Sequence, residues 1–431
     1  MKEHASRSFR KWARNFGVLD GNKLRMTLLN NWEATYLNFK EEKLYELLGA
    51  AKDLGVDLFL LDDGWFANKY PRNNATTGLG DWDVNKAKLP NGIAKLVKDA
   101  NDKGVKFGIW VEPEMVSPKS ELYEKHPDWI IKLPNRQEHY YRSQLVLDLT
   151  NPKVQDFAFS VVDNLMTQNP GIAYIKWDCN RMMTNTYAPY LKNRQSHVFI
   201  EYQRGLYKVL DRLRAKYPHL PIMLCSGGGG RVDYGALKYF TEFWPSDNTD
   251  GLERVYMQWG YSYFFPSVAM SAHVTSWGKQ SIKFRTDVAM QGRLGYDIDL
   301  KDMSPQDLEF SKKAVETYKR ISPVIWQGDL YRLISPYDEA RSVMMYVSKD
   351  KNKAILFSCT TTPRYAPNFA PVKLEGLDAN KKYDIQEINT YGNARAASFK
   401  GLDGERLMKE GINISSGSPI TSRVYEISLA Q

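Results

Sequence analysis

The stretch Tyr174-Ile-Lys-Trp-Asp-Cys-Asn-Arg181 decides how the rest of the chain is interpreted. An apolar run over residues 172–175 leads directly into Lys176 and Asp178. Parallel α/β enzymes present their chemistry in this way, because a buried strand holds the side chains at its carboxyl end rigidly. A buried aspartate without a purpose is costly. The stretch therefore predicts a strand that ends in a functional site, and the alternative is an aspartate that only caps the next helix.

Strand and helix patterns alternate on both sides of this stretch. Expected strands span residues 24–29, 57–61, 106–111, 172–175, 221–224 and a short segment at 243–247. Expected helices span 41–55, a segment around 93–100, a helix that begins at Asn151-Pro152, and 199–213. Two further units fit between about residues 260 and 325. About eight units favour a closed (β/α)8 TIM barrel over an open doubly wound sheet, and no Gly-x-Gly-x-x-Gly follows the first strand, which disfavours a dinucleotide-binding fold.

The pattern changes near residue 327. Strand-length apolar or alternating segments at 340–347, 354–359 and 424–429 are separated by turn signals, and no helical face is evident. Such a pattern is typical of an antiparallel β-domain. We therefore predict a (β/α)8 catalytic barrel with a short helical lead-in over residues 1–326, followed by a C-terminal antiparallel β-sandwich over 327–431.

Composition limits the classes of function. The 431 residues carry 59 basic and 50 acidic side chains without a long basic run, so the net charge of +9 does not establish nucleic-acid binding. The three cysteines are few and far apart, which argues against a disulfide framework. No signal-peptide h-region or membrane-length apolar run is present. We expect a soluble, cytoplasmic protein without a membrane partner, and its 13% aromatic content points mildly to carbohydrate.

Polar and aromatic side chains collect where the predicted strands end. In a barrel these ends converge on one mouth, so residues far apart in the sequence share a pocket. The residues at these positions are Asp62, Asp63, Trp110, Glu112, Lys176, Asp178, Cys225, Trp244 and Asp247.

Two carboxylates across a pocket, with tryptophans around them, suit glycoside hydrolysis. One carboxylate attacks the anomeric carbon and the other protonates the leaving oxygen. Lys176 points the same way along its strand as Asp178, and its charge keeps that carboxylate ionised. Asp247 is the better acid, because partial burial near aromatic surface raises its pKa.

Other chemistries fit the sequence less well. Schiff-base chemistry on Lys176 is disfavoured, because nearby acids keep the ammonium protonated. The glycine run Gly227–Gly230 lacks the Lys-Ser/Thr of a phosphate-binding loop, so it predicts close backbone approach to a ligand. No histidine pair has metal-ligand spacing, although His273 could line the mouth or sit in the core. We expect no metal and no other cofactor.

Taken together, the motifs resemble the family-36 glycoside hydrolases, the microbial α-galactosidases. The matches run in family order over about residues 5 to 300. They are Asn30-Asn-Trp-Glu-Ala-Thr35, Leu60-Leu-Asp-Asp-Gly-Trp65, Gly78-Leu-Gly-Asp-Trp82, Trp110-Val-Glu-Pro-Glu-Met115, Ile175-Lys-Trp-Asp178 with Asn180-Arg181, Cys225-Ser-Gly-Gly-Gly-Gly-Arg231 and Trp244-Pro-Ser-Asp-Asn-Thr-Asp250.

The resemblance implies a retaining double displacement on terminal α-galactosides of the melibiose and raffinose type. By this resemblance Asp178 is the nucleophile, Asp247 is the acid/base, and Asp62 and Asp63 grip the galactose O4 and O6 hydroxyls. The other implied sugar-binding residues are Trp110, Arg142, Lys176, Cys225, Gly228 and Trp244. Cys225 and Gly228 match the loop near O2, which favours galactose over N-acetylgalactosamine.

The sequence departs from the family in two places. Cys179 stands where a methionine is usual, a change that we expect to be tolerated. The family's large N-terminal β-sandwich is missing before the barrel, so we expect a fragment or a naturally short form. Homo-oligomerisation is a family trait that the missing sandwich leaves open.

Several functions remain open at this point. They are the same mechanism on an α-N-acetylgalactosaminide or a β-L-arabinopyranoside, transfer to a sugar acceptor, and a non-catalytic galactoside-binding protein. The presence of both Asp178 and Asp247 speaks against the binding protein. In each case the partner is a small oligosaccharide, not a nucleic acid.

Overall fold

The computed structural model describes residues 2–365 and 368–430 of the chain. These residues fall into two compact units, which are described separately. Unit 1 comprises Met1–Leu28, Asp53–Val56 and Pro245–Gln431, and unit 2 comprises Leu29–Lys52 and Asp57–Trp244. The predicted division between residues 326 and 327 is a different one, and it stays a prediction.

Unit 2 is built on five parallel strands. They are β2 (Leu58–Leu61), β3 (Lys106–Val111), β6 (Ile172–Trp177), β7 (Ile222–Leu224) and β8 (Glu242–Phe243), each paired with the next. Their inner residues are apolar because a parallel sheet is covered on both faces. Trp110 pairs with Lys176 in the β3–β6 register, so both side chains leave the sheet on the same face.

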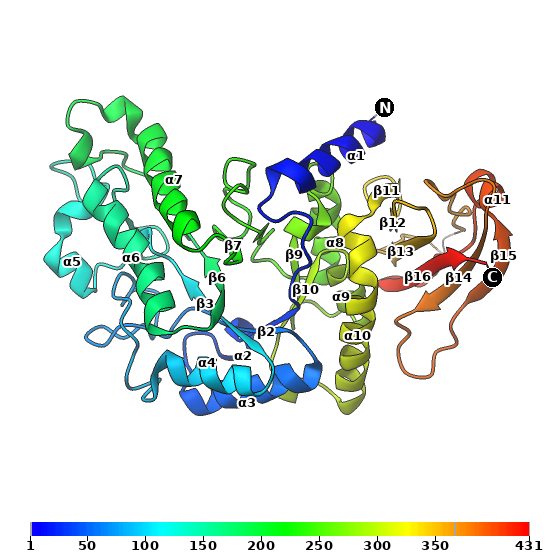
Figure 1. Cartoon of the computed structure of the whole chain (residues 1–431), viewed down its shortest axis with the longest axis horizontal. Coiled ribbons are helices and arrows are strands. Elements are labelled where there is room, and N and C mark those ends of the chain that lie inside the picture. The colour runs from blue at the N-terminus through cyan, green and yellow to red at the C-terminus, as the bar shows by residue number, and fades with distance from the viewer. Residues whose placement is uncertain (1, 366–367, 431) are drawn as a thin grey trace. The chain divides into compact units, whose positions relative to one another are not determined.

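Two helices of unit 2 precede β2 along the chain, and the others lie between its strands. The helices are α2 (Trp32–Thr35), α3 (Glu41–Leu54), α4 (Gly92–Asp102), α5 (Glu121–Lys125), α6 (Pro152–Gln168) and α7 (Val198–Lys216), with 3-10 turns at Pro127–Trp129, Pro189–Leu191 and Gln195–His197. The start predicted for α6 is confirmed, because the Asn151 side chain accepts the Lys153 N–H and Pro152 occupies the first turn. Helices α6 and α7 lie side by side (Figure 1). A small antiparallel pair, β4 (Met115–Val116) and β5 (Leu145–Val146), completes the unit.

Unit 1 contains the remaining barrel elements. The predicted lead-in helix is α1 (Lys2–Trp12), continued by a π-helical turn at Ala13–Gly17. Further along are α8 (Gly251–Tyr261), β9 (Ser271–Val274), α9 (Ile282–Ala289), β10 (Arg293–Asp297) and α10 (Pro305–Gln327), with 3-10 turns at Ser267–Ala269 and Leu300–Asp302. Strands β9 and β10 are parallel, and two strand–helix units are thus found where two were predicted.

The order of the eight-stranded sheet is β8-β7-β6-β3-β2-β1-β10-β9, where β1 spans Leu28–Asn30. Strands of this sheet that follow one another along the chain are neighbours, except β8 and β9, which stand at its two ends, and the first strand, β1, lies beside the last, β10. This is the order of a (β/α)8 barrel, which confirms the predicted fold class. Among the described residues no helix is long and apolar enough to cross a membrane.

The C-terminal region is the predicted antiparallel β-structure. Its strands are β11 (Asp329–Ile334), β12 (Arg341–Val347), β13 (Lys353–Thr360), β14 (Lys382–Ile388), β15 (Ser398–Asp403) and β16 (Thr421–Leu429), in the order β11-β12-β13-β16-β14-β15. Buried residues such as Val343, Leu356 and Ile427 form its core. One short helix, α11 (Gly404–Lys409), is also present, and its six residues are too few to show a helical face in the sequence.

Candidate active site

Asp178 lies directly after β6, and the protein holds its carboxylate from several sides. Its backbone N–H donates to the Val111 carbonyl at 2.8 Å, which ties the strand end to β3. Its Oδ2 accepts hydrogen bonds from Trp110 Nε1 at 3.2 Å and from Asn180 Nδ2 at 2.8 Å. Its Oδ1 accepts the Cys179 N–H at 2.8 Å. The side chain is therefore both buried and fixed in orientation.

These surroundings determine the charge of Asp178. Burial alone raises the pKa of a carboxyl group, but here the Lys176 ammonium and hydrogen bonds from Cys225, Cys179 and Asn180 outweigh it. The net result is a pKa for Asp178 below its ordinary value. Asp178 is thus an ionised and oriented carboxylate at neutral pH, as the sequence predicted.

Lys176 forms an ion pair with Asp62 at the end of β2. The ammonium lies 2.7 Å from Oδ2 of Asp62, and both side chains are buried. The same oxygen accepts from Asn30 Nδ2 at 2.7 Å, while the Asp62 N–H donates to Asn31 Oδ1 at 2.7 Å. Burial lowers the pKa of Lys176, but Asp62, with Cys225 and Asp178, raises it above the ordinary value. A protonated ammonium is not a nucleophile, which argues against Schiff-base chemistry.

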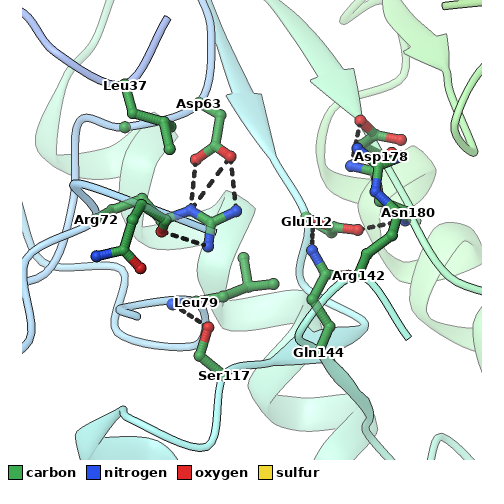
Figure 2. Close-up of polar contacts among 12 residues, drawn as sticks. Leu37, Asp63, Arg72, Leu79, Glu112, Ser117, Arg142, Gln144, Asp178 and Asn180 are labelled. Carbon is green, nitrogen blue, oxygen red and sulfur yellow. Dashed lines mark hydrogen bonds and ion pairs between the residues drawn. The ribbon is translucent and has the colours of Figure 1, made fainter. Parts of the chain in front are cut away.

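Asp63, the next residue, is held by an arginine. Arg72 Nε lies 3.1 Å from Oδ1 and Nη2 lies 2.8 Å from Oδ2 of Asp63, a forked arrangement that fixes the plane of the carboxylate (Figure 2). The Arg72 carbonyl accepts from Lys88 Nζ at 2.9 Å. Lys88 also donates to the carbonyls of Leu37 and Gly64, both at 2.7 Å. One buried lysine thereby ties together the segments around Asp63.

Two further acids follow β3, and their surroundings differ. Glu114 accepts from Trp177 Nε1 at 2.8 Å and from the Tyr202 hydroxyl at 2.8 Å, and it pairs with Arg231 at 2.7 Å. It therefore serves as a structural anchor. Glu112 instead accepts from neutral groups, the Asn180 N–H and Gln144 Nε2. Burial and the nearby Asp178 carboxylate raise the pKa of Glu112 to about 8.

The remaining predicted sugar-binding residues of unit 2 lie around this cluster. Arg142 Nη1 donates to Asn180 Oδ1 at 3.2 Å. Cys225 follows β7, is buried, and donates its thiol to Asp178. Gly228, at φ +95°, belongs to a tight loop whose Gly227 N–H lies 3.4 Å from Asp178 Oδ1. Trp244 follows β8 and is buried, and its backbone N–H donates to the Leu224 carbonyl at 2.9 Å.

Asp247 belongs to unit 1 and is described there. Arg254 donates to the carbonyls of Ser246 and Asn248, both at 2.8 Å, and so fixes the segment that carries Asp247. The Asp247 side chain is exposed. The partial burial that the sequence analysis expected for it is not found in this structure, because the loop after β8 presents the carboxylate to solvent.

The structure thus brings together Asp62, Trp110, Lys176, Asp178 and Cys225 in one cluster, with Asp63 adjacent. Sequence reasoning missed the residues that hold these side chains, namely Asn30, Arg72, Lys88 and Gln144. Asn30 had a signal, since it stands at the end of the first strand and Asp62 directly follows the second. Among the described residues, no group of three or more histidine, cysteine or acidic side chains is arranged to hold a metal ion.

Two protein-family models match most of the chain. The model of the Melibiase family matches residues 4–328, and the model of the glycosyl hydrolase family 36 C-terminal domain matches residues 341–427. Alpha-galactosidase AgaA of Geobacillus stearothermophilus is 40% identical over 395 residues, which cover 90% of this chain and 52% of the relative. Alpha-galactosidase Mel36A of Lactobacillus acidophilus is 39% identical over 375 residues, covering 85% and 50%.

Solved structures give the same picture. The crystal structure of the GH36 α-galactosidase AgaA from Geobacillus stearothermophilus has a TM-score of 0.92 and 36% identity, and the match covers all of this chain and 59% of that one. Variants of AgaA have been crystallised in complex with raffinose and with stachyose. The chain spans about half the length of the curated relatives it matches. From its motifs, its sheet order and these matches, the chain belongs to the melibiase family of glycoside hydrolases and carries the family-36 C-terminal domain.

Proposed function

We propose that this protein is a retaining exo-α-galactosidase that hydrolyses terminal α-galactosides of the melibiose and raffinose type. The observation that carries the proposal is the state of Asp178, an ionised carboxylate held by donors from three neighbouring strand ends. An oriented carboxylate at this place suits attack on an anomeric carbon. The relatives named above, among them α-galactosidases crystallised with raffinose and stachyose, support the choice of substrate.

The reaction proceeds in two displacements. Asp178 attacks the anomeric carbon of the α-galactoside, and the bond to the leaving oxygen breaks as Asp247 gives that oxygen a proton. This produces a β-linked galactosyl-enzyme. Asp247, now ionised, takes a proton from water, and the resulting oxygen nucleophile displaces Asp178 to release α-galactose. The Lys176 charge keeps Asp178 in the form that can attack and later leave.

The sugar is held by the groups around the nucleophile. We assign Asp62 and Asp63 as acceptors for the O4 and O6 hydroxyls, and the ammonium of Lys176 has donors beyond the one given to Asp62. Trp110 offers its ring as a wall, because its N–H is already committed to Asp178. Arg142, Cys225, Gly228 and Trp244 complete the proposed binding set, with Cys225 and Gly228 on the side of O2.

A substrate panel tests this proposal. Initial rates are measured with p-nitrophenyl α-galactoside, α-N-acetylgalactosaminide, β-L-arabinopyranoside and β-galactoside, and with melibiose and raffinose. We expect the α-galactosides to react fastest, with α-galactose as the first product seen by proton NMR. Faster turnover of another glycone, or β-galactose as the first product, would overturn the proposal. A wild-type protein that binds galactose by calorimetry but hydrolyses nothing would be a binding protein.

The location of the protein and its oligomeric state belong to the same proposal. We infer a cytoplasmic location, because three cysteines that lie far apart in the sequence do not make a disulfide framework. A homo-oligomer is also proposed, on the family resemblance alone. Light scattering after size-exclusion chromatography measures the mass of the assembly, and a mass of one chain at micromolar concentration would exclude it.

A further inference from the structure

Glu112 is a buried carboxyl group that lies behind the proposed nucleophile. Its side chain is 0% exposed. Its Oε1 accepts the Asn180 N–H, and its Oε2 accepts from Gln144 Nε2 at 3.2 Å. Figure 2 shows Glu112 between Gln144 and Asn180. No arginine or lysine pairs with it in the part of the chain that the structure describes.

Asn180 connects this carboxyl group to Asp178. Its side-chain Nδ2 donates to Asp178 Oδ2 at 2.8 Å, and its Oδ1 accepts from Arg142 Nη1 at 3.2 Å. Its backbone N–H is the group that Glu112 accepts. Asn180 lies three residues beyond the end of β6 (Ile172–Trp177), so the hydrogen bonds of the sheet do not hold it.

We propose that Glu112, supported by Gln144, is a positioning residue that fixes Asn180 against Asp178. The inference rests on the proposed function, because it assigns Glu112 a part in orienting the proposed nucleophile. Glu112 itself does not contact the reacting atoms. Its role is to hold the backbone of Asn180 so that the Asn180 amide meets Asp178 in one orientation.

The surroundings also determine the form in which Glu112 does this. The charged groups that face it are the carboxylates of Asp178 and Asp63, which disfavour a second negative charge, and the guanidinium of Arg72, which favours one. The Cys179 thiol is also near, and burial raises its pKa, so it is neutral. Burial and the two carboxylates prevail, so Glu112 is a neutral carboxylic acid at neutral pH while Asp178 carries the charge.

Gln144 can pair with Glu112 in either charge form of that carboxyl group. Gln144 Oε1 is buried and has no hydrogen-bond partner. The two ends of a glutamine amide are assigned from the hydrogen-bond network. Turning the Gln144 amide about its last bond lets its oxygen accept the hydroxyl of a protonated Glu112, while Oε1 of Glu112 still accepts the Asn180 N–H.

Substitutions at Glu112 separate positioning from charge. Glu112→Gln keeps a neutral acceptor for Asn180, so we expect kcat within about threefold of wild type on p-nitrophenyl α-galactoside. Glu112→Ala removes that acceptor, and we expect kcat to fall about 100-fold, the scale of a misplacement of about 1 Å. The inhibition constant for galactose should change less than about threefold in both, because Glu112 does not bind the sugar. Gln144→Ala, which removes only the support, should give a smaller loss in kcat.

A matched control excludes a general loss of packing. Glu41 is also a buried glutamate of unit 2, and it accepts from Asn91 Nδ2 at 2.5 Å, away from the cluster around Asp178. Glu41→Ala should leave kcat unchanged once activity is normalised to the folded fraction measured by circular dichroism. An equal fall in kcat in Glu41→Ala and Glu112→Ala would reduce Glu112 to a structural role and overturn the proposal. Full activity in Glu112→Ala, or a Glu112→Gln as inactive as Glu112→Ala, would overturn it as well.

A second readout does not need turnover. Carbon-13 NMR of labelled aspartate carboxyls, assigned with Asp178→Asn, follows the pKa of Asp178. The Asn180 hydrogen bond helps to lower this pKa, so it should be higher in Glu112→Ala than in Glu112→Gln, and equal values would contradict the inference. A wild type inactive on every α-galactoside would defeat the proposed function alone, and the NMR comparison would still decide the role of Glu112.

Discussion

The ammonium of Lys176 lies 2.7 Å from Oδ2 of Asp62, although 114 positions separate the two residues in the sequence. The ion pair joins the carboxyl ends of β6 and β2 across the intervening strand β3. It places a buried positive charge beside Asp178 and a buried acceptor beside the proposed galactose site. Substitutions in this pair therefore affect substrate binding and the charge of the nucleophile separately.

Asp62→Ala should weaken both binding and folding. The substitution removes a proposed acceptor for a galactose hydroxyl and leaves the Lys176 ammonium buried without its ion-pair partner. Breaking one side of a buried pair costs about 3 to 5 kcal/mol of unfolding free energy. We expect KM for melibiose to rise at least tenfold, because the galactose hydroxyl would lose its proposed acceptor. Urea unfolding and steady-state kinetics measure the two effects, and an unchanged KM would remove Asp62 from the sugar site.

Lys176→Met should shift the acid limb of the pH profile. The Lys176 charge lowers the pKa of Asp178, so its removal lets burial raise that pKa. Because the attacking form is the carboxylate, log(kcat/KM) should begin to fall at a higher pH than in wild type as the solution is acidified. Lys176→Arg, which keeps the charge, is the control and should retain more of the wild-type profile. An acid limb at the same pH in Lys176→Met would show that the lysine does not set the charge of Asp178.

Lys88→Met should loosen the loop that carries Asp63. The three carbonyls that Lys88 binds would be left in a buried place without a donor. Each unsatisfied buried group costs about 1 to 3 kcal/mol, so we expect a loss of at least about 2 kcal/mol in urea unfolding. KM should rise, because Asp63 would be held less firmly as a proposed sugar contact, while kcat should change less. Lys86 is an exposed lysine nearby, and Lys86→Met is the control. Equal stability of the two variants would show that Lys88 does not hold these carbonyls in a way that matters for folding.

Glu112→Gln should change how stability depends on pH. The pKa of Glu112 is about 8 in the folded chain against an ordinary value of 4.5, so the folded state keeps a proton that the unfolded state loses between these values. The contribution of Glu112 to stability is therefore fully present below about pH 4.5 and is lost as the pH rises towards about 8. Glutamine does not titrate. The Tm of Glu112→Gln minus the Tm of wild type should therefore be larger at pH 8 than at pH 4. An equal difference at the two pH values would show that Glu112 is ionised in the folded protein.

How far the sequence predicts this site depends on which residues follow a regular pattern. Asp62, Trp110, Lys176 and Asp178 were predictable because they lie at the ends of apolar runs, and parallel strands bring such ends to one edge. Arg72 and Lys88 lie in the long segment between β2 and α4, whose path no periodicity determines. The same limit applies to α11, which is too short to show a helical face.

Charge states were only partly predictable. The ionised Asp178 followed from the nearby lysine in the sequence, and the structure agrees. The neutral Glu112 did not follow, because it depends on complete burial and on the neutral character of Gln144, which is distant in the sequence. The exposed position of Asp247 was likewise hidden, since the sequence shows neighbouring aromatic residues but not the direction of the loop.

Asp178 as nucleophile and Asp247 as acid/base are the two roles on which the proposed retaining α-galactosidase depends. The most direct test is release of p-nitrophenol from its α-galactoside by wild type, Asp178→Ala and Asp247→Ala, with and without azide. We predict that both variants lose activity and that azide restores product formation. Asp178→Ala should convert the α-galactoside into β-galactosyl azide, and Asp247→Ala should convert it into α-galactosyl azide. Activity that persists in Asp178→Ala without azide would contradict the account.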